Sequence, residues 1–71
     1  MKEKIGKTAG KIWDILQKEE EVAISRFPKM LDEKTSVVQQ ALGWLAREDK
    51  IDYRQEANRT LISLKASERR S

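Results

Sequence analysis

The sequence predicts an α+β fold that is mainly α, with three helices, one short strand and a C-terminal β-hairpin. Two stretches carry apolar residues at helical spacing, and the C-terminal third carries two short apolar runs typical of strands. The length of 71 residues limits the chain to one domain. We expect that domain over residues 1–64, followed by a polar basic tail over 65–71 that lacks apolar periodicity and is expected to be disordered.

The first helix is predicted over residues 3–18. Its apolar positions follow the i, i+4, i+7, i+8, i+11 pattern of an amphipathic helix, and they are Ile5, Ala9, Ile12, Trp13 and Leu16. Three glutamates at 19–21 then form a solvated connection. Residues 22–25 are short and partly β-branched, which favours a minimal strand.

Two further helices follow, separated by a polar turn. Ser25 is a candidate N-cap for a helix over 26–31, where Pro28 is tolerated because first-turn amides have no intrahelical partner. The apolar residues of that helix, Phe27, Met30 and Leu31, are predicted to enter the core. Thr35 or Ser36 is predicted to cap a third helix that ends near residue 48.

The stretches 51–55 and 60–64 are predicted to form the two strands of a hairpin. In the linking segment, Asn58 is the residue expected to adopt a left-handed conformation, and Tyr53 is expected to contact the core. The order helix, short strand, helix, turn, helix, hairpin is that of a winged helix-turn-helix. A three-helix bundle with a disordered C-terminus is the alternative, which the apolar stretch TLISL (60–64) disfavours.

Three stretches of the chain also resemble a family of small winged helix-turn-helix proteins of unknown function, best known from bacteria. They are ALGWLAREDKI (41–51), GKTAGKIWDIL (6–16) and AISRFPKML (23–31). The resemblance covers about residues 3–64. It implies a winged-helix fold, DNA binding and self-association, and it supplies no known activity, ligand or target sequence.

Composition excludes several classes of function. The chain has neither cysteine nor histidine, so disulfides, thiolate metal sites and the commonest general base are absent. We therefore expect no cofactor and no metal. The sequence shows no glycine-rich phosphate loop and no nucleophile with a base, so it predicts neither an enzyme nor a small-molecule substrate.

The charge and hydropathy patterns indicate where the protein acts. The formal net charge is +3, with 15 basic against 12 acidic residues, which permits an acidic partner without demanding one. No apolar run approaches the roughly 18 residues of a membrane span, so we expect no membrane partner. The N-terminus lacks the apolar segment of a signal peptide. The expected location is the cytoplasm, at the nucleoid if the chain binds DNA.

Gly43 interrupts the third helix at a cost of about 1 kcal/mol relative to alanine. A rotation of about 100° per residue places a core face of Val38, Ala41, Leu42 and Leu45 on one side. Gly43 falls near the middle of the opposite stripe, and Val37 and Trp44 share one flank between the two faces.

Three interpretations of this arrangement stay open. In the first, Gly43 is merely tolerated and Trp44 covers the edge of the core. In the second, Gly43 lets the helix approach DNA closely, since glutamine and arginine on the same stripe can reach base edges. In the third, Gly43 admits the backbone of another protein, and Trp44 supplies an apolar contact.

The function predicted from the sequence is binding of double-stranded DNA by a homodimer, as a transcriptional regulator or a nucleoid protein. The predicted DNA-binding residues are Ser36, Gln39, Gln40, Gly43, Arg47, Arg54, Arg59, Arg69 and Arg70. The predicted dimer interface consists of Trp13, Val37 and Trp44. The alternative function is a protein-interaction or assembly module that uses the same fold without binding DNA.

Overall fold

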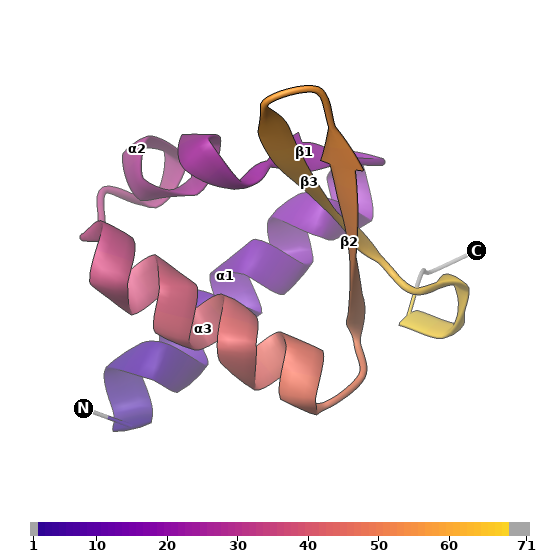
Figure 1. The fold of residues 1–71 in the computed structure, drawn as a ribbon. Helices are drawn as coiled ribbons and strands as arrows, with labels where there is room; N and C mark the ends of the chain where they lie inside the picture. Colours follow the sequence, from indigo (N-terminus) through magenta and orange to yellow (C-terminus); the bar gives the residue numbers. More distant parts are fainter. Residues whose placement is uncertain (1, 69–71) are drawn as a thin grey trace.

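Helices and a small sheet pack on one another in the computed structural model, which describes residues 2–68 (Figure 1). The helices are α1 (Lys2–Lys18), α2 (Phe27–Leu31) and α3 (Thr35–Arg47), and the strands are β1 (Val22–Ala23), β2 (Ile51–Glu56) and β3 (Arg59–Leu64). Two 3₁₀ turns, η1 (Ile24–Arg26) and η2 (Ala66–Glu68), complete the described chain. The predicted winged helix-turn-helix architecture is confirmed.

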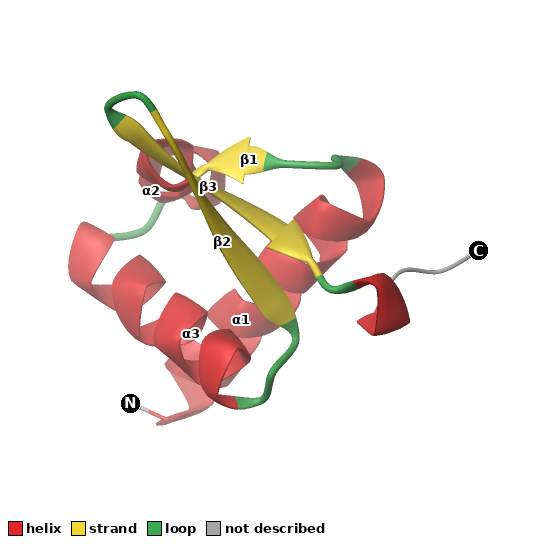
Figure 2. Ribbon diagram, turned by 45° about the vertical axis from the view of Figure 1, so that its right-hand side comes forward, coloured by secondary structure: helices red, strands yellow, loops and turns green. Residues whose placement is uncertain are grey.

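The sheet is antiparallel throughout, in the order β1-β3-β2. Val22 pairs with Ile62, and at the far end of the hairpin Glu56 pairs with Arg59. The central strand is therefore β3, and β2 is an edge strand. Figure 2 shows the β2–β3 hairpin as a twisted ribbon whose tip reaches past α2, which is the geometry of a wing.

The core lies where α1, α2 and α3 meet the inner face of the sheet. Its largest side chains are almost fully excluded from solvent, and they include Ile12, Leu16, Phe27, Leu42 and Ile62. These residues come from α1, α2, α3 and β3, so every major element contributes to one cluster. Burial of such a side chain contributes about 1.5–3 kcal/mol, and this cluster fixes the orientation of α3.

The predicted helix caps are wrong. Ser25 lies inside η1, and α2 starts after Arg26 without a side-chain cap. The N-cap of α3 is Lys34, so Thr35 is already helical. For α3 the reason is the three-residue turn after α2, in which Asp32 takes a left-handed φ of 53° and its amide donates to the Lys29 carbonyl. Backbone hydrogen bonds close this turn and set the first helical residue.

The tip of the wing also differs from the prediction, because Ala57, with a φ of 51°, occupies the left-handed region and Asn58 does not. The two-residue connection between Glu56 and Arg59 has its positive φ at the first central position. A type II′ hairpin turn has this pattern and favours glycine there.

We expect the Ala57→Gly variant to be more stable than the native chain by about 1 kcal/mol. Glycine adopts a positive φ without the steric penalty that an alanine Cβ incurs. Urea denaturation followed by tryptophan fluorescence measures the difference. A less stable variant would mean that the entropy glycine adds to the unfolded chain outweighs the relief of strain.

Met30 and Tyr53, both predicted to enter or contact the core, are 42% and 49% exposed. In α2 the core face is set by Phe27 and, four residues later, Leu31, which leaves Met30 to one side. Tyr53 lies on the same face of β2 as Ile51, but β2 is the edge strand, so one flank of Tyr53 has no neighbouring strand.

Residues 65–68, the start of the segment expected to be a disordered tail, contact the domain in the structure. The Lys65 amide donates to the Lys50 carbonyl at 3.0 Å, and the Lys65 ammonium lies 3.3 and 3.1 Å from carboxylate oxygens of Asp49 and Asp52. Gln17 Nε2 donates to the Glu68 carbonyl at 2.6 Å. Contacts to α1 and to the base of the wing therefore hold residues 65–68.

None of the helices in residues 2–68 is long and apolar enough to span a membrane.

Candidate nucleic-acid interface

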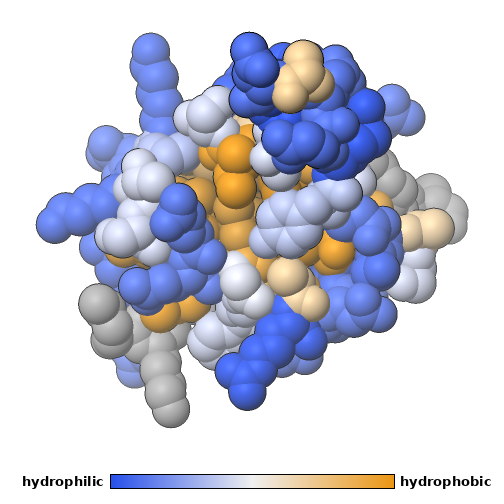
Figure 3. All heavy atoms as spheres, viewed as in Figure 1, coloured by the Kyte–Doolittle hydropathy of each residue, from blue (hydrophilic) through white to orange (hydrophobic). Residues whose placement is uncertain are grey.

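The outer stripe of α3 is a polar surface that the fold leaves uncovered. All five predicted DNA-binding residues of this helix are exposed, namely Ser36, Gln39, Gln40, Gly43 and Arg47. The opposite face carries the predicted core residues Val38, Ala41, Leu42 and Leu45, all buried. The predicted orientation of this helix is confirmed. Hydrophilic residues predominate on this side of the molecule and surround a central patch of apolar surface (Figure 3).

Gly43 has open space in front of it. No atom of the described chain lies within 4 Å of the place that a Cβ would occupy, apart from its own helix backbone and neighbours. Intramolecular packing therefore does not require glycine at this position. Glycine weakens the helix here, and the open space in front of it would accommodate the backbone of another molecule close to α3.

Trp44 lies beside Gly43 and is 42% exposed. It lies outside the buried core cluster, and the chain covers part of its surface. The indole lines a groove of about 650 Å³ between α1 and α3, whose walls are Ile5, Gln40, Gly43, Trp44, Arg47 and Glu48. This groove shares three residues with the outer stripe of α3.

The three predicted dimer residues do not form one surface. Val37 is only 8% exposed, so it offers little area to a partner. Trp13 packs against the core from α1 and lines a second hollow of about 440 Å³ together with Gly6, Gly10 and Leu45. Trp44 lines the separate groove of about 650 Å³, which contains neither Trp13 nor Val37.

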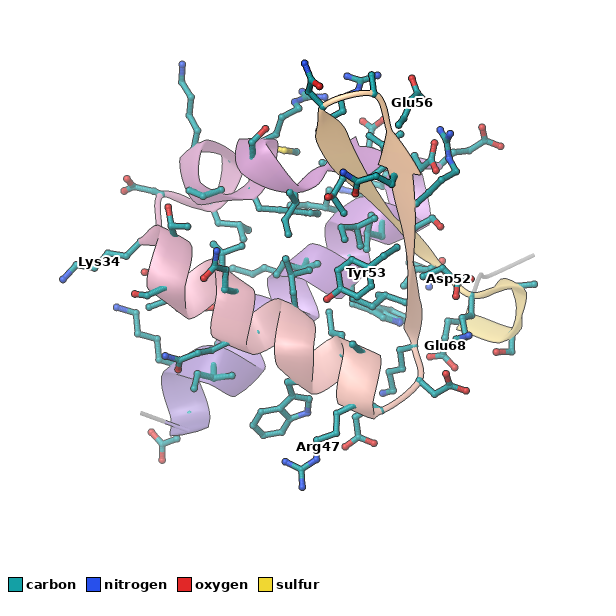
Figure 4. All side chains as sticks on the ribbon, in the orientation of Figure 1. Lys34, Arg47, Asp52, Tyr53, Glu56 and Glu68 are labelled. Carbon is teal, nitrogen blue, oxygen red and sulfur yellow. The ribbon has the colours of Figure 1, made fainter. Side chains whose placement is uncertain are left out.

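Four cations surround the helix-turn-helix without acidic partners. Within residues 2–68, no ion pair engages Arg26, Lys29, Lys34 or Arg47, and all four side chains are exposed. Figure 4 shows Lys34 and Arg47 extending outward from opposite ends of α3. The sequence prediction does not include Arg26 and Lys29. Their positions beside Phe27, whose burial turns its neighbours outward, are the signal that identifies them.

The two arginines of the wing, Arg54 and Arg59, do have acidic partners. Arg54 donates from Nε and Nη2 to the two carboxylate oxygens of Glu21, both at 2.7 Å, and its Nη2 also lies 2.7 Å from Glu56. Arg59 makes one longer contact of 3.5 Å to Glu56 and keeps 60% of its side chain exposed. Arg54 therefore ties β2 to the residue before β1, across β3, and its charge is already compensated.

This ion-pair network predicts a pH dependence of stability. Hydrogen bonds from Arg54 lower the pKa of Glu21 and of Glu56 below their ordinary value of 4.5. Because both carboxylates have a lower pKa in the folded chain, their contribution is complete above pH 4.5 and is lost as the pH falls through the folded-state pKa.

We therefore expect the Arg54→Gln variant to have a lower thermal midpoint than the native chain at pH 7. The gap should close as the pH falls below 4.5, because the native carboxylates become protonated and lose their partner. Thermal unfolding followed by circular dichroism across this range measures both midpoints. A gap that stays constant with pH would contradict a role for these ion pairs.

Arg69 and Arg70, predicted to hold DNA loosely, lie outside the described residues. Among residues 2–68, no group of three or more acidic side chains is arranged to hold a metal ion. The candidate binding features of the described chain are the outer stripe of α3, the four cations around it and the hollows beside α3.

Comparison with known proteins agrees with this architecture. A family model described as "Winged helix-turn-helix domain (DUF2582)" matches residues 1–64. The uncharacterized protein MJ1608 of Methanocaldococcus jannaschii is 42% identical over 65 residues, an alignment that covers 87% of this chain and 91% of that protein.

Two solved structures share the fold. The solution NMR structure of protein BT2368 from Bacteroides thetaiotaomicron has a TM-score of 0.77 at 27% identity and covers 89% of this chain and 77% of that one. Reduced HlyU from Vibrio cholerae also has a TM-score of 0.77, at 24% identity over 86% of this chain, and this chain spans only 63% of its length. Together with the observed three helices and wing, the family match shows that the chain belongs to the winged helix-turn-helix family DUF2582.

Proposed function

We propose that this chain binds double-stranded DNA by placing α3 in the major groove. In a helix-turn-helix the second helix enters the groove and the first crosses the sugar-phosphate backbone. The observation that carries the proposal is the exposed outer stripe of α3, open at Gly43, with four exposed cations around it that have no ion-pair partner in residues 2–68. The proposed biological role of this binding is transcriptional regulation or organisation of the nucleoid, in the cytoplasm.

The residues of α3 have distinct roles in this proposal. Gln39 and Gln40 present amides that can pair with N6 and N7 of adenine, and Arg47 presents a fork that suits O6 and N7 of guanine. Ser36 lies one residue into the helix, where its hydroxyl reaches a base edge or a phosphate. Gly43 lacks a side chain, so the backbone of α3 can come close to the groove floor.

Phosphate contacts come from outside the stripe. Arg26 and Lys29 lie in and beside α2, which crosses the DNA backbone in this geometry, and Lys34 precedes α3. On the wing, Arg59 makes only the 3.5 Å contact to Glu56 and stays exposed, so its guanidinium reaches a phosphate or the minor groove. Arg54, in contrast, holds the wing in place through its ion pairs. The prediction that Arg69 and Arg70 add electrostatic attraction to DNA is kept in this proposal.

A homodimer is part of the proposal, and the two hollows constrain its geometry. A partner copy on Trp44 would cover Gln40, Gly43 and Arg47, which line the same groove. Such a dimer would compete with DNA. In this proposal the dimer leaves α3 free and uses the surface of α1 around Trp13, where Gly6 and Gly10 leave a hollow of about 440 Å³.

Titration of a labelled generic duplex at two salt concentrations tests DNA binding. With about four phosphate contacts per chain, log K for one bound chain falls by about 3.6 per decade of salt, so affinity should drop about a hundredfold between 50 and 200 mM, and a bound dimer doubles this slope. A Lys34→Gln variant should reduce the slope by about 0.9, because it removes one phosphate contact. Absence of binding at the lower salt would refute the proposal.

The second candidate function is a protein-interaction module that does not use DNA. The half-exposed Trp44 in the groove between α1 and α3 favours it, since tryptophan is enriched at the centre of protein interfaces. The same titration distinguishes the two functions. If no duplex binds, the groove at Trp44 becomes the principal candidate site, and light scattering then measures self-association.

A further inference from the structure

A third hollow lies on the flank of α3 that faces α2. Its volume is about 290 Å³, and it is lined by Ile24, Ser25, Pro28, Thr35, Val38 and Gln39. The lining residues come from η1 and from the N-terminal turns of α2 and α3. The hollow therefore lies beside the part of α3 that contacts base edges in a helix-turn-helix.

Apolar carbon atoms dominate this hollow although it opens onto a polar surface. Ile24, Pro28 and Val38 supply its apolar lining, and Thr35 adds a methyl group at the first position of α3. Figure 3 shows apolar surface open to solvent in the middle of this side of the molecule, ringed by hydrophilic residues. No described segment of the chain covers it.

DNA offers one apolar group in its major groove, the C5-methyl of thymine. The elements that line the hollow also carry or adjoin the cations Arg26, Lys29 and Lys34, whose charge is complementary to the phosphates flanking a base pair. On this basis we infer that the hollow accepts thymine methyl groups, so that the chain prefers A·T pairs beside the N-terminus of α3. This inference rests on the proposed DNA binding.

The polar residues of the hollow complete the recognition of the pair. Gln39 lies on α3 one turn after Thr35, so its amide reaches N6 and N7 of an adenine next to the thymine whose methyl enters the hollow. Val38 is 1% exposed and forms the floor. A volume of about 290 Å³ exceeds one methyl group, so the methyl groups of thymines in adjacent A·T pairs, which lie on opposite strands of an alternating sequence, share the site.

The experiment compares an alternating A·T duplex with the same duplex in which every thymine is replaced by uracil. Every register of these duplexes presents the same bases, so no target sequence has to be known. The native chain should bind the uracil duplex about fourfold more weakly for each thymine methyl group that the hollow would otherwise bury, from about 0.8 kcal/mol per buried carbon group. The minor groove is unchanged by this replacement, so minor-groove recognition of A·T pairs would give equal affinities.

Two variants assign the effect to the hollow. Thr35→Ser removes one methyl from its wall and should reduce the ratio of thymine to uracil affinity. Gln40→Ala is the matched control, because Gln40 lines the groove on the other side of α3 and its removal should weaken both duplexes equally. Equal affinity of the native chain for the two duplexes would overturn this inference and leave DNA binding intact. Failure to bind either duplex at low salt would overturn both.

Discussion

The Gly43→Glu variant is expected to bind duplex DNA about 30- to 100-fold more weakly than the native chain while keeping its fold. The new carboxylate would lie in the middle of the outer stripe, facing the bases and phosphates of the groove, and like charges in a contact cost several kcal/mol. The fold should persist because no atom of the described chain lies within 4 Å of the new Cβ apart from the local helix. Duplex titration at fixed salt and thermal unfolding measure the two effects.

The Gly43→Ala variant is the matched control. Alanine favours the helix by about 1 kcal/mol over glycine, which raises the thermal midpoint of a domain of this size by about 4–8 °C. Its effect on DNA binding should be small beside that of the carboxylate, since a methyl group adds no charge. Destabilisation of the alanine variant would show that position 43 is enclosed in solution. Unchanged DNA binding by the glutamate variant would remove α3 from the interface.

The orientation of α3 could be predicted because helical periodicity is a local property. Apolar residues at positions 38, 41, 42 and 45 define one face whatever the rest of the chain does. The exposure of Gly43 follows from its position on the opposite face of the same helix. The same reasoning fails for Val37, which lies at the margin of the core face, because the packing of the neighbouring helix decides whether a marginal residue is buried.

Local details that depend on the chain path could not be predicted from composition. A left-handed residue was expected at Asn58, since asparagine tolerates this conformation, but the hairpin register places it at Ala57. The N-cap of α3 was displaced in the same way by the left-handed Asp32 in the turn before that helix. In both places tertiary geometry selects the position of the turn.

Electrostatic partners are the part of the site that sequence reasoning predicts least well. Arg54 and Glu21 are 33 positions apart, and only the pairing of β1 and β2 on either side of β3 brings them together. Their contact compensates the charge of a residue that the sequence predicts as a DNA ligand. Arg26 and Lys29 were not predicted as DNA ligands, yet the burial of Phe27 leaves both of them exposed beside α3.

Phe27 is the residue whose truncation should have the largest effect on stability. It is fully buried and is among the largest side chains of the core, and it begins the short helix α2. The Phe27→Ala variant should be destabilised by about 3–5 kcal/mol, from the missing transfer energy and the cavity left behind. A domain of this length has a total stability of about 4–10 kcal/mol, so most or all of it would disappear.

The expected destabilisation also connects stability to function. The five residues of α2 are too few to form a helix alone, so their contact through Phe27 with the core positions them against α3. The Met30→Ala variant truncates a residue of similar size in the same helix, but Met30 is 42% exposed, so the cost should stay near 1 kcal/mol or less. Urea denaturation of both variants measures the contrast. Equal costs would mean that α2 is held by contacts other than Phe27, whereas a large cost only at Phe27 would establish that one aromatic ring maintains the geometry of the helix-turn-helix.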